Sequence, residues 1–120
     1  WVDQVGQHAV SLIPKEKLYL GIPLYGYDWV GMKGISKTYE DIEGLREWLG
    51  VQAQFDPVSK SPYFSYVLDG VTHEVWYENA ESAGYKMQVA RDHGIAGWSF
   101  FNLGGEDPLV LEKMVEQASQ

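Results

Sequence analysis

The sequence predicts an α/β protein built on a parallel sheet that a small α+β insertion interrupts once. Two nearly continuous apolar runs, residues 17–25 and 95–101, are typical of strands buried on both faces of a parallel sheet. Each run follows a segment with helical apolar spacing, and this alternation indicates βα units. Two parallel strands can neither close a barrel nor cover both sheet faces, so we expect the chain to be part of a larger domain.

The first unit is predicted to be a helix followed by a buried strand. Apolar residues recur at helical spacing over residues 2–12, and Pro14 ends that run. The strand then occupies residues 17–25. The sequence opens in mid-pattern at Trp1, without a methionine, as we expect of a fragment of a longer protein.

The insertion begins with a segment of different character. Residues 26–34 are rich in glycine and aromatic side chains and are expected to form a loop. Either Ser36 or Thr38 can cap a helix over residues 39–49, and Gly50 is suited to end it.

Three short alternating runs follow and predict antiparallel strands. These runs are residues 51–55, 63–68 and 72–77. Asp69-Gly70, between the last two runs, is a strong signal for a hairpin turn. The insertion is therefore predicted to combine one helix with a small antiparallel sheet.

The last part of the chain returns to the βα pattern. A helix is predicted from Asn79 to about His93, with Gly94 at its carboxyl end. The buried run 95–101 follows it. Asp107-Pro108 is then expected to cap and begin a final helix to about residue 118.

Composition narrows the classes of partner. The formal net charge of −8 argues against nucleic acid or an anionic membrane as a partner, because both bind positive surfaces. The absence of cysteine excludes disulfides and thiolate metal sites. No apolar run approaches transmembrane length, and the first residues do not resemble a signal peptide. The aromatic content of 14% suits either core packing or a face on which sugar rings stack.

Several segments resemble one enzyme family. Residues 17–26 (KLYLGIPLYG) and 94–99 (GIAGWS) resemble the seventh and eighth barrel strands of family-18 glycoside hydrolases, the chitinase-like enzymes. Three further segments are similar to the spore-germination and spore cortex-lytic N-acetylglucosaminidases of endospore-forming bacteria: 25–29 (YGYDW), 61–64 (SPYF) and 73–79 (HEVWYEN). The resemblance covers essentially the whole chain, in order and at natural spacing.

The resemblance implies a specific architecture. The chain would be the C-terminal quarter of a (β/α)8 TIM barrel that carries a small α+β insertion. Residues 1–26 would form a barrel helix and strand seven, and residues 27–78 the insertion. Residues 79–120 would form a barrel helix, strand eight and the final helix.

The resemblance also implies a chemistry. The family cleaves β-1,4-linked N-acetylglucosamine polymers, such as cortex peptidoglycan or chitin-like chains, by substrate-assisted retaining hydrolysis. The sugar's acetamide oxygen attacks the anomeric carbon, and a protonated Glu in an Asp-x-x-Asp-x-Asp-x-Glu motif donates the proton. This sequence lacks that spacing, so we expect no catalytic residue here, no cofactor, and no activity from these 120 residues alone. The resemblance places the parent protein outside the cell, in the cell wall or on the spore surface.

The resemblance also implies substrate-binding residues within this chain. Trp98 matches the strand-eight Trp that forms the apolar floor beneath the reacting sugar, although a core position is the alternative. Tyr25, at the end of the preceding strand, is a second candidate. Glu78 could bind a sugar hydroxyl or be a solvated acid at a helix start. The candidates for a cleft wall, or else for packing between insertion and barrel, are Tyr27, Trp29, Trp76 and Tyr77.

The sequence also raises three other interpretations. A metal site of the zincin type needs a second His four residues after His73, where Tyr77 stands. The chain could also belong to a non-catalytic, lectin-like relative. The presence or absence of the catalytic Glu in the upstream part of the protein would distinguish the two. The chain could also be an interaction module that self-associates through exposed strand edges.

Overall fold

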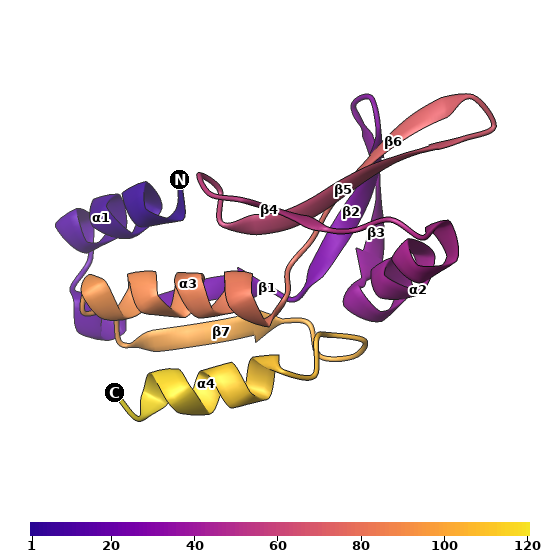
Figure 1. The fold of residues 1–120 in the computed structure, drawn as a ribbon. Coiled ribbons are helices and arrows are strands. Elements are labelled where there is room, and N and C mark those ends of the chain that lie inside the picture. The colour runs from indigo at the N-terminus through magenta and orange to yellow at the C-terminus, as the bar shows by residue number, and fades with distance from the viewer.

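Two separate sheets organise the chain, and the computed structural model describes all 120 residues (Figure 1). In chain order the elements are α1 (Val2–Leu12), the 3-10 helix η1 (Lys15–Lys17), β1 (Tyr19–Pro23), β2 (Tyr25–Val30), β3 (Lys33–Thr38), α2 (Tyr39–Leu49), β4 (Gln54–Asp56), β5 (Ser61–Leu68), β6 (Val71–Trp76), α3 (Ala80–Asp92), β7 (Gly97–Phe101) and α4 (Val110–Ala118). Strands β1 and β7 form a parallel pair, and the other sheet has the antiparallel order β3-β2-β6-β5-β4. The expected mixture of parallel βα units and an α+β insertion is confirmed.

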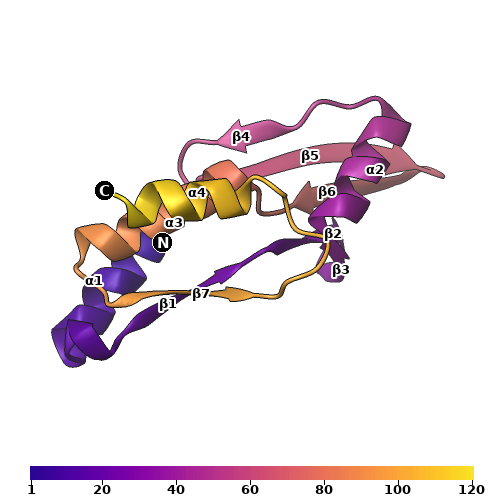
Figure 2. The ribbon, with the colours of Figure 1, turned by 90° about the horizontal axis from the view of Figure 1, so that it is seen from below.

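Helices cover one face of the parallel pair. Figure 2 shows α3 and α4 on the same side of β1 and β7. The buried residues on this side are Ile22, Leu24, Ala80, Ala83, Met87 and Val110. On the opposite face, Tyr19 and Phe101 are 66% and 68% exposed. The prediction that these strands are buried on both faces is therefore wrong for this chain, because helices pack against one side only.

Residues 26–34, predicted to be a loop, lie instead in the β2–β3 hairpin. Their mixed composition hides a two-residue alternation, which places Gly26 and Asp28 on a buried face and Tyr27 and Trp29 on the other. The glycine that serves the turn is Gly31, with φ +58°. Glycine and aromatic content indicated a loop, but the alternation of burial makes a strand.

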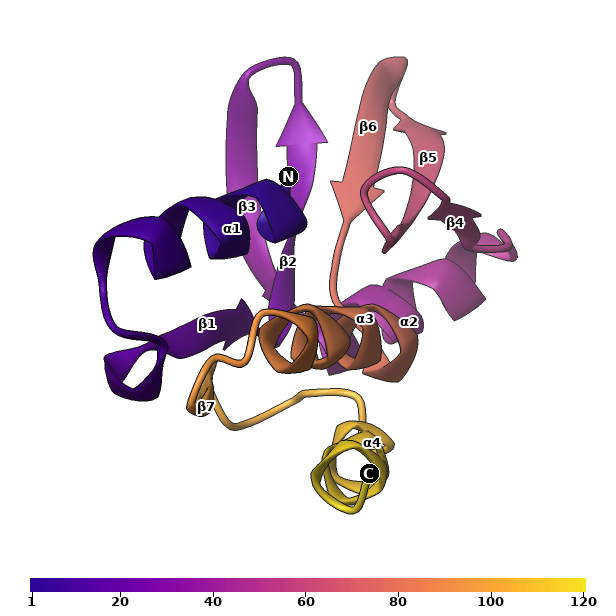
Figure 3. The ribbon, with the colours of Figure 1, turned by 90° about the vertical axis from the view of Figure 1, so that its left-hand side faces the viewer.

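The insertion sheet packs on α2. Figure 3 shows the β2–β3 and β5–β6 hairpins extending in the same direction, away from α3. The core between sheet and helix contains Ile42, Phe64, Tyr66, Val75 and Tyr77. The bounds predicted for α2 are confirmed: the Thr38 hydroxyl accepts from the Asp41 N–H at 3.1 Å, and Gly50 takes the left-handed conformation at φ +66°.

Asp107 links the start of α3 to the turn that precedes α4. Its Oδ2 accepts from the N–H of Ala80, the first residue of α3, at 2.7 Å, and its Oδ1 accepts from Leu109 N–H at 3.0 Å. A carboxylate is favourable at a helix amino end. The last helix therefore begins at Val110, later than the sequence predicts, because Asp107 caps the turn before α4 and the start of α3 together.

Candidate functional site

A row of aromatic side chains crosses from the parallel pair to the insertion sheet. Phe101 ends β7, and Tyr25 follows β1 after a single intervening residue. Their ring centroids lie 6.2 Å apart in an edge-on arrangement. Tyr25 contacts Tyr27 at 5.8 Å, and Tyr27 contacts Trp29 at 5.3 Å. We call Phe101, Tyr25, Tyr27 and Trp29 the aromatic row.

Backbone hydrogen bonds and strand alternation hold the aromatic row in place. The Leu24 N–H donates to the Phe101 carbonyl at 2.8 Å, which fixes the end of β1 beside the end of β7. Residues two apart in a strand share a face, so the three row residues of β2 project from the same side. Opposite Trp29 in β3 stands Gly34, where a Cβ would lie 2.8 Å from the indole ring. The glycine therefore lets the indole lie close against β3.

The same face of the insertion sheet carries a second aromatic pair. Trp76 in β6 stands opposite both Tyr27 of β2 and Tyr63 of β5. The Tyr63 and Trp76 rings stack with centroids 4.5 Å apart and planes 16° apart. The Tyr63 hydroxyl donates to Gln54 Oε1 at 2.8 Å. Aromatic rings therefore extend from the end of β7 across three strands of the insertion.

The family follows from comparison with known proteins. Residues 1–107 match the family described as glycosyl hydrolases family 18. The chain belongs to glycosyl hydrolase family 18. This membership confirms the resemblance drawn from the two parallel strands, and the family is one of glycosidases.

The matching family-18 relatives include spore enzymes of Bacillus. The chain is 32% identical over 124 residues to the cortical fragment-lytic enzyme of Bacillus anthracis, covering 96% of this chain and 28% of that enzyme. It is 36% identical over 110 residues to the uncharacterized glycosylase YvbX of Bacillus subtilis (strain 168), covering 88% and 32%. The chain thus spans less than a third of the length of these relatives.

Solved family-18 structures share the fold of this chain. The spore cortex-lytic enzyme SleL of Bacillus cereus superimposes with a TM-score of 0.89 at 31% identity, over 97% of this chain and 28% of SleL. A chitinase from Chromobacterium violaceum superimposes with a TM-score of 0.87 at 33% identity, over 96% and 37%. The chain therefore has the mixed α/β fold of chitinase-like family-18 structures.

Trp98 does not lie in the aromatic row of this family-18 chain. It pairs with Leu20 across the parallel strands and packs against the core beneath α3 and α4. The core position, the alternative considered from the sequence, is the one observed. Phe101, which the sequence analysis did not select, lies on the open face instead. Side chains alternate between the two faces of a strand, so Trp98 and Phe100 lie on one face of β7 and Phe101 on the other. This alternation is the sequence signal that distinguishes Phe101 from Trp98.

Tyr77 is likewise a core residue and not part of a cleft wall. Tyr77 is buried between the insertion sheet and α2, and its hydroxyl donates to Glu43 Oε1 at 3.2 Å. Burial, followed by the nearby Glu43 carboxylate, raises the pKa of the Tyr77 hydroxyl. The alternation of β6 places Trp76 on the aromatic face and the residue after it on the opposite side.

Glu78 forms a buried ion pair at the junction of insertion and βα region. Its carboxylate pairs with Lys86 Nζ and accepts from Ser82 Oγ at 2.6 Å. Burial raises the pKa of Glu78, while Lys86 and Ser82 oppose that shift. Both carboxylate oxygens thus have partners within the chain, so Glu78 is a buried, paired acid that stabilises the start of α3.

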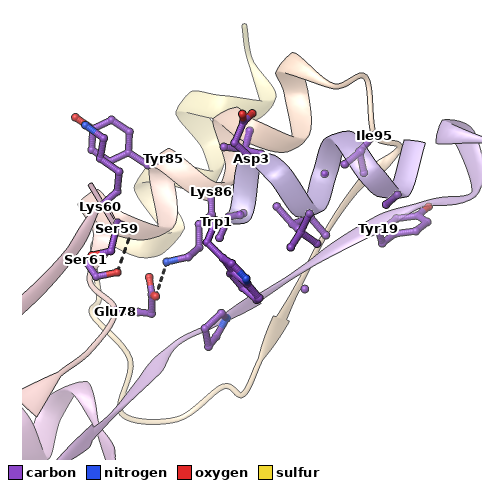
Figure 4. A pocket seen from close by; sticks show the side chains of 18 of the residues that line it. Trp1, Asp3, Tyr19, Ser59, Lys60, Ser61, Glu78, Tyr85, Lys86 and Ile95 are labelled. Atoms are coloured by element: carbon purple, nitrogen blue, oxygen red, sulfur yellow. Dashed lines mark hydrogen bonds and ion pairs between the residues drawn. The ribbon is translucent and has the colours of Figure 1, made fainter. Parts of the chain in front are cut away.

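Glu78 borders a cavity of about 790 Å³ between α1 and β1 (Figure 4). Trp1 and Lys86 project toward it, and Tyr19 lies at its far side. Strand β1 pairs only with β7, so its second edge is unpaired where it borders this cavity. No residue of the aromatic row lines this cavity. The row begins instead at the carboxyl ends of the parallel strands, with Phe101 and Tyr25.

Neither a metal-binding cluster nor a membrane-spanning helix occurs in the structure. The structure contains no group of three or more His, Asp or Glu side chains arranged to hold a metal ion. No helix combines the length and apolar character needed to cross a membrane.

Proposed function

We propose that the chain is the C-terminal quarter of a (β/α)8 barrel, with β1 and β7 as barrel strands seven and eight. The free edge of β1 supports this, because a closed barrel pairs both edges of every strand. The one-sided helix cover of the parallel pair supports it as well, since barrel helices form an outer ring. Residues 27–78 are then the insertion between strand seven and the following helix.

We propose further that the parent protein hydrolyses β-1,4-linked N-acetylglucosamine polymers and that this chain supplies part of the sugar-binding surface. The observation that carries this proposal is the aromatic row at the carboxyl ends of β1 and β7. In barrel enzymes the active site lies at that end of the strands. The apolar face of a pyranose ring packs on an aromatic ring, so a row of rings suits a polysaccharide.

Within this function, the row binds and orients the substrate. Phe101, at the end of strand eight, takes the place proposed from the sequence for Trp98, with Tyr25 beside it. Rings at this position hold the reacting sugar and exclude water, which favours attack by its own acetamide oxygen. Tyr27, Trp29 and Trp76 continue the wall for neighbouring sugars. The proton for the leaving group comes from an acid outside these residues, because no Asp-x-x-Asp-x-Asp-x-Glu motif occurs here.

The relatives support a proposed substrate class and location. The cortical fragment-lytic enzymes point to cortex peptidoglycan, and the chitinases point to chitin-like chains. Both polymers lie outside the cytoplasm, so we propose an extracellular, cell-wall or spore-surface protein.

The experiment compares the intact parent protein with the 120-residue chain on chitin oligosaccharides and purified spore cortex. The intact protein is expected to release reducing ends from one of them, and the isolated chain is expected to release none. Turnover by the isolated chain would refute the assignment of the acid to another segment. Binding without cleavage by the intact protein would identify a lectin-like relative.

We also propose that the isolated chain self-associates through its free strand edges. The unpaired edge of β1 borders the cavity of about 790 Å³, and unpaired strand edges recruit other strands. Exposed apolar side chains that line the same cavity, Trp1 and Val5, would add to the contact. Light scattering is expected to give a mass above the 13.6 kDa of the chain. A stable monomer with cooperative unfolding would contradict both self-association and the barrel-quarter architecture.

A further inference from the structure

A buried polar cluster lies behind the aromatic row, on the opposite face of the insertion sheet. Asp28 Oδ1 lies 2.8 Å from His73 Nδ1, and Asp28 Oδ2 accepts a hydrogen bond from the Tyr66 hydroxyl. The Tyr66 and His73 rings stack with centroids 4.4 Å apart and planes 18° apart. Each of the three side chains thus contacts the other two.

Because the cluster is buried, its hydrogen bonds strongly constrain the relative positions of the strands that carry it. Asp28 is 7% exposed and Tyr66 9% exposed, and a buried carboxylate is costly unless hydrogen-bond donors satisfy it. Burial and the adjacent Asp28 raise the pKa of Tyr66, so its hydroxyl stays protonated and remains a donor. The three residues come from β2, β5 and β6, which are the three central strands of the sheet. The cluster therefore fixes these strands relative to one another.

The cluster is directly linked to the aromatic row through the backbone. Asp28 stands between Tyr27 and Trp29 in β2, and its side chain points to the face opposite theirs. In β6, His73 precedes Glu74, whose carboxylate accepts from Trp76 Nε1. Anchoring the buried face of β2 and β6 therefore determines where the rings on the open face stand.

We propose that Asp28, Tyr66 and His73 are positioning residues that set the geometry of the aromatic row for substrate binding. This inference rests on the proposed function of that row. The three residues do not touch the sugar. They act through β2 and β6, so their loss weakens substrate binding more than it slows the chemical step.

The test is made in the intact parent protein with Tyr66→Phe, which removes one hydrogen bond and keeps the stacked ring. KM for chitin oligosaccharides is expected to rise about fivefold, with kcat changed less than about twofold, because the row shifts while the reacting groups stay in place. Hydrogen exchange at the Tyr27 and Trp29 amides is expected to accelerate. The matched control is Tyr77→Phe, which also removes a buried hydroxyl from this sheet but contacts Glu43 instead of Asp28. It is expected to leave KM and those two amides unchanged.

A second pair of variants keeps the proposal testable if Tyr66→Phe does not fold. In Asp28→Asn the amide can accept from Tyr66 and donate to His73, so KM is expected to stay near that of the natural protein. Asp28→Ala cannot do either and is expected to raise KM. Equal KM values for these two folded variants, or equal effects of Tyr66→Phe and Tyr77→Phe, would overturn the proposal.

The exchange measurement separates this proposal from the proposed function, because it needs no sugar. If the natural protein neither binds nor cleaves the oligosaccharides, the proposed function fails. Faster exchange at Tyr27 and Trp29 in Tyr66→Phe alone would then still support positioning of the row by the cluster. Unchanged exchange in that variant would refute it.

Discussion

Replacing Phe101 and Tyr25 together by alanine is expected to raise KM of the parent protein for N-acetylglucosamine oligosaccharides about 100-fold. Each aromatic ring in such a contact contributes about 1.4 kcal/mol, and each 1.4 kcal/mol corresponds to about a tenfold change in binding. Both rings lie at the carboxyl ends of the parallel strands, with centroids 6.2 Å apart. The measurement is steady-state hydrolysis of a soluble oligosaccharide.

Two control variants make this result specific. Trp48→Ala removes an exposed aromatic side chain from α2, outside the aromatic row, and is expected to leave KM unchanged. Trp98→Leu removes a ring that packs against the helix-facing core, so it is expected to lower the free energy of unfolding by about 2 kcal/mol with little change in KM. A large rise in KM for folded Trp98→Leu, with none for the double variant, would contradict our placement of the sugar site.

The largest loss of stability is expected from Gly26→Ala. A Cβ at this position would lie 2.4 Å from the Tyr77 Cβ and 2.5 Å from the Trp76 carbonyl oxygen. Both contacts are too short, and backbone atoms cannot move aside as a flexible side chain can. Either β2 or β6 must shift, and both carry aromatic residues of the open face. We expect a loss of about 3 kcal/mol in the free energy of unfolding, measured by urea denaturation.

The matched control is Gly44→Ala in α2. No atom lies within 4 Å of a Cβ at this exposed helical position. Alanine favours a helix over glycine by about 1 kcal/mol, so this variant is expected to be more stable than the natural protein. If Gly26→Ala were as stable as Gly44→Ala, the close approach of β2 to β6 would be wrong.

Local signals explain which elements the sequence predicts well. The predicted bounds of α1 and α2 agree with the structure. Pro14 ends the first helical run, and Thr38 and Gly50 enclose the second, so the information lies within a few residues of each end. The hairpin turn at Asp69-Gly70 is equally local, and both residues have positive φ.

The sequence predicts less well where tertiary packing decides. In β7 both alternating sets contain aromatic residues, Trp98 and Phe100 in one and Phe101 in the other. Alternation separates the sets, but the side on which α3 and α4 pack decides which of them is buried. The same limit applies to Tyr77 and Glu78, whose core and ion-pair roles depend on α2 and on Lys86. The Asp28, Tyr66 and His73 cluster joins residues up to 45 positions apart and has no local signal.

The most direct test of our account is a crystal structure of the intact parent protein bound to an N-acetylglucosamine tetrasaccharide, with its proposed catalytic acid replaced by glutamine. We expect one pyranose ring to pack on Phe101 and Tyr25, the neighbouring sugars to follow Tyr27 and Trp29, and Trp98 to remain beneath α3 and α4. A sugar bound away from the aromatic row, or in contact with the Trp98 ring, would contradict the account.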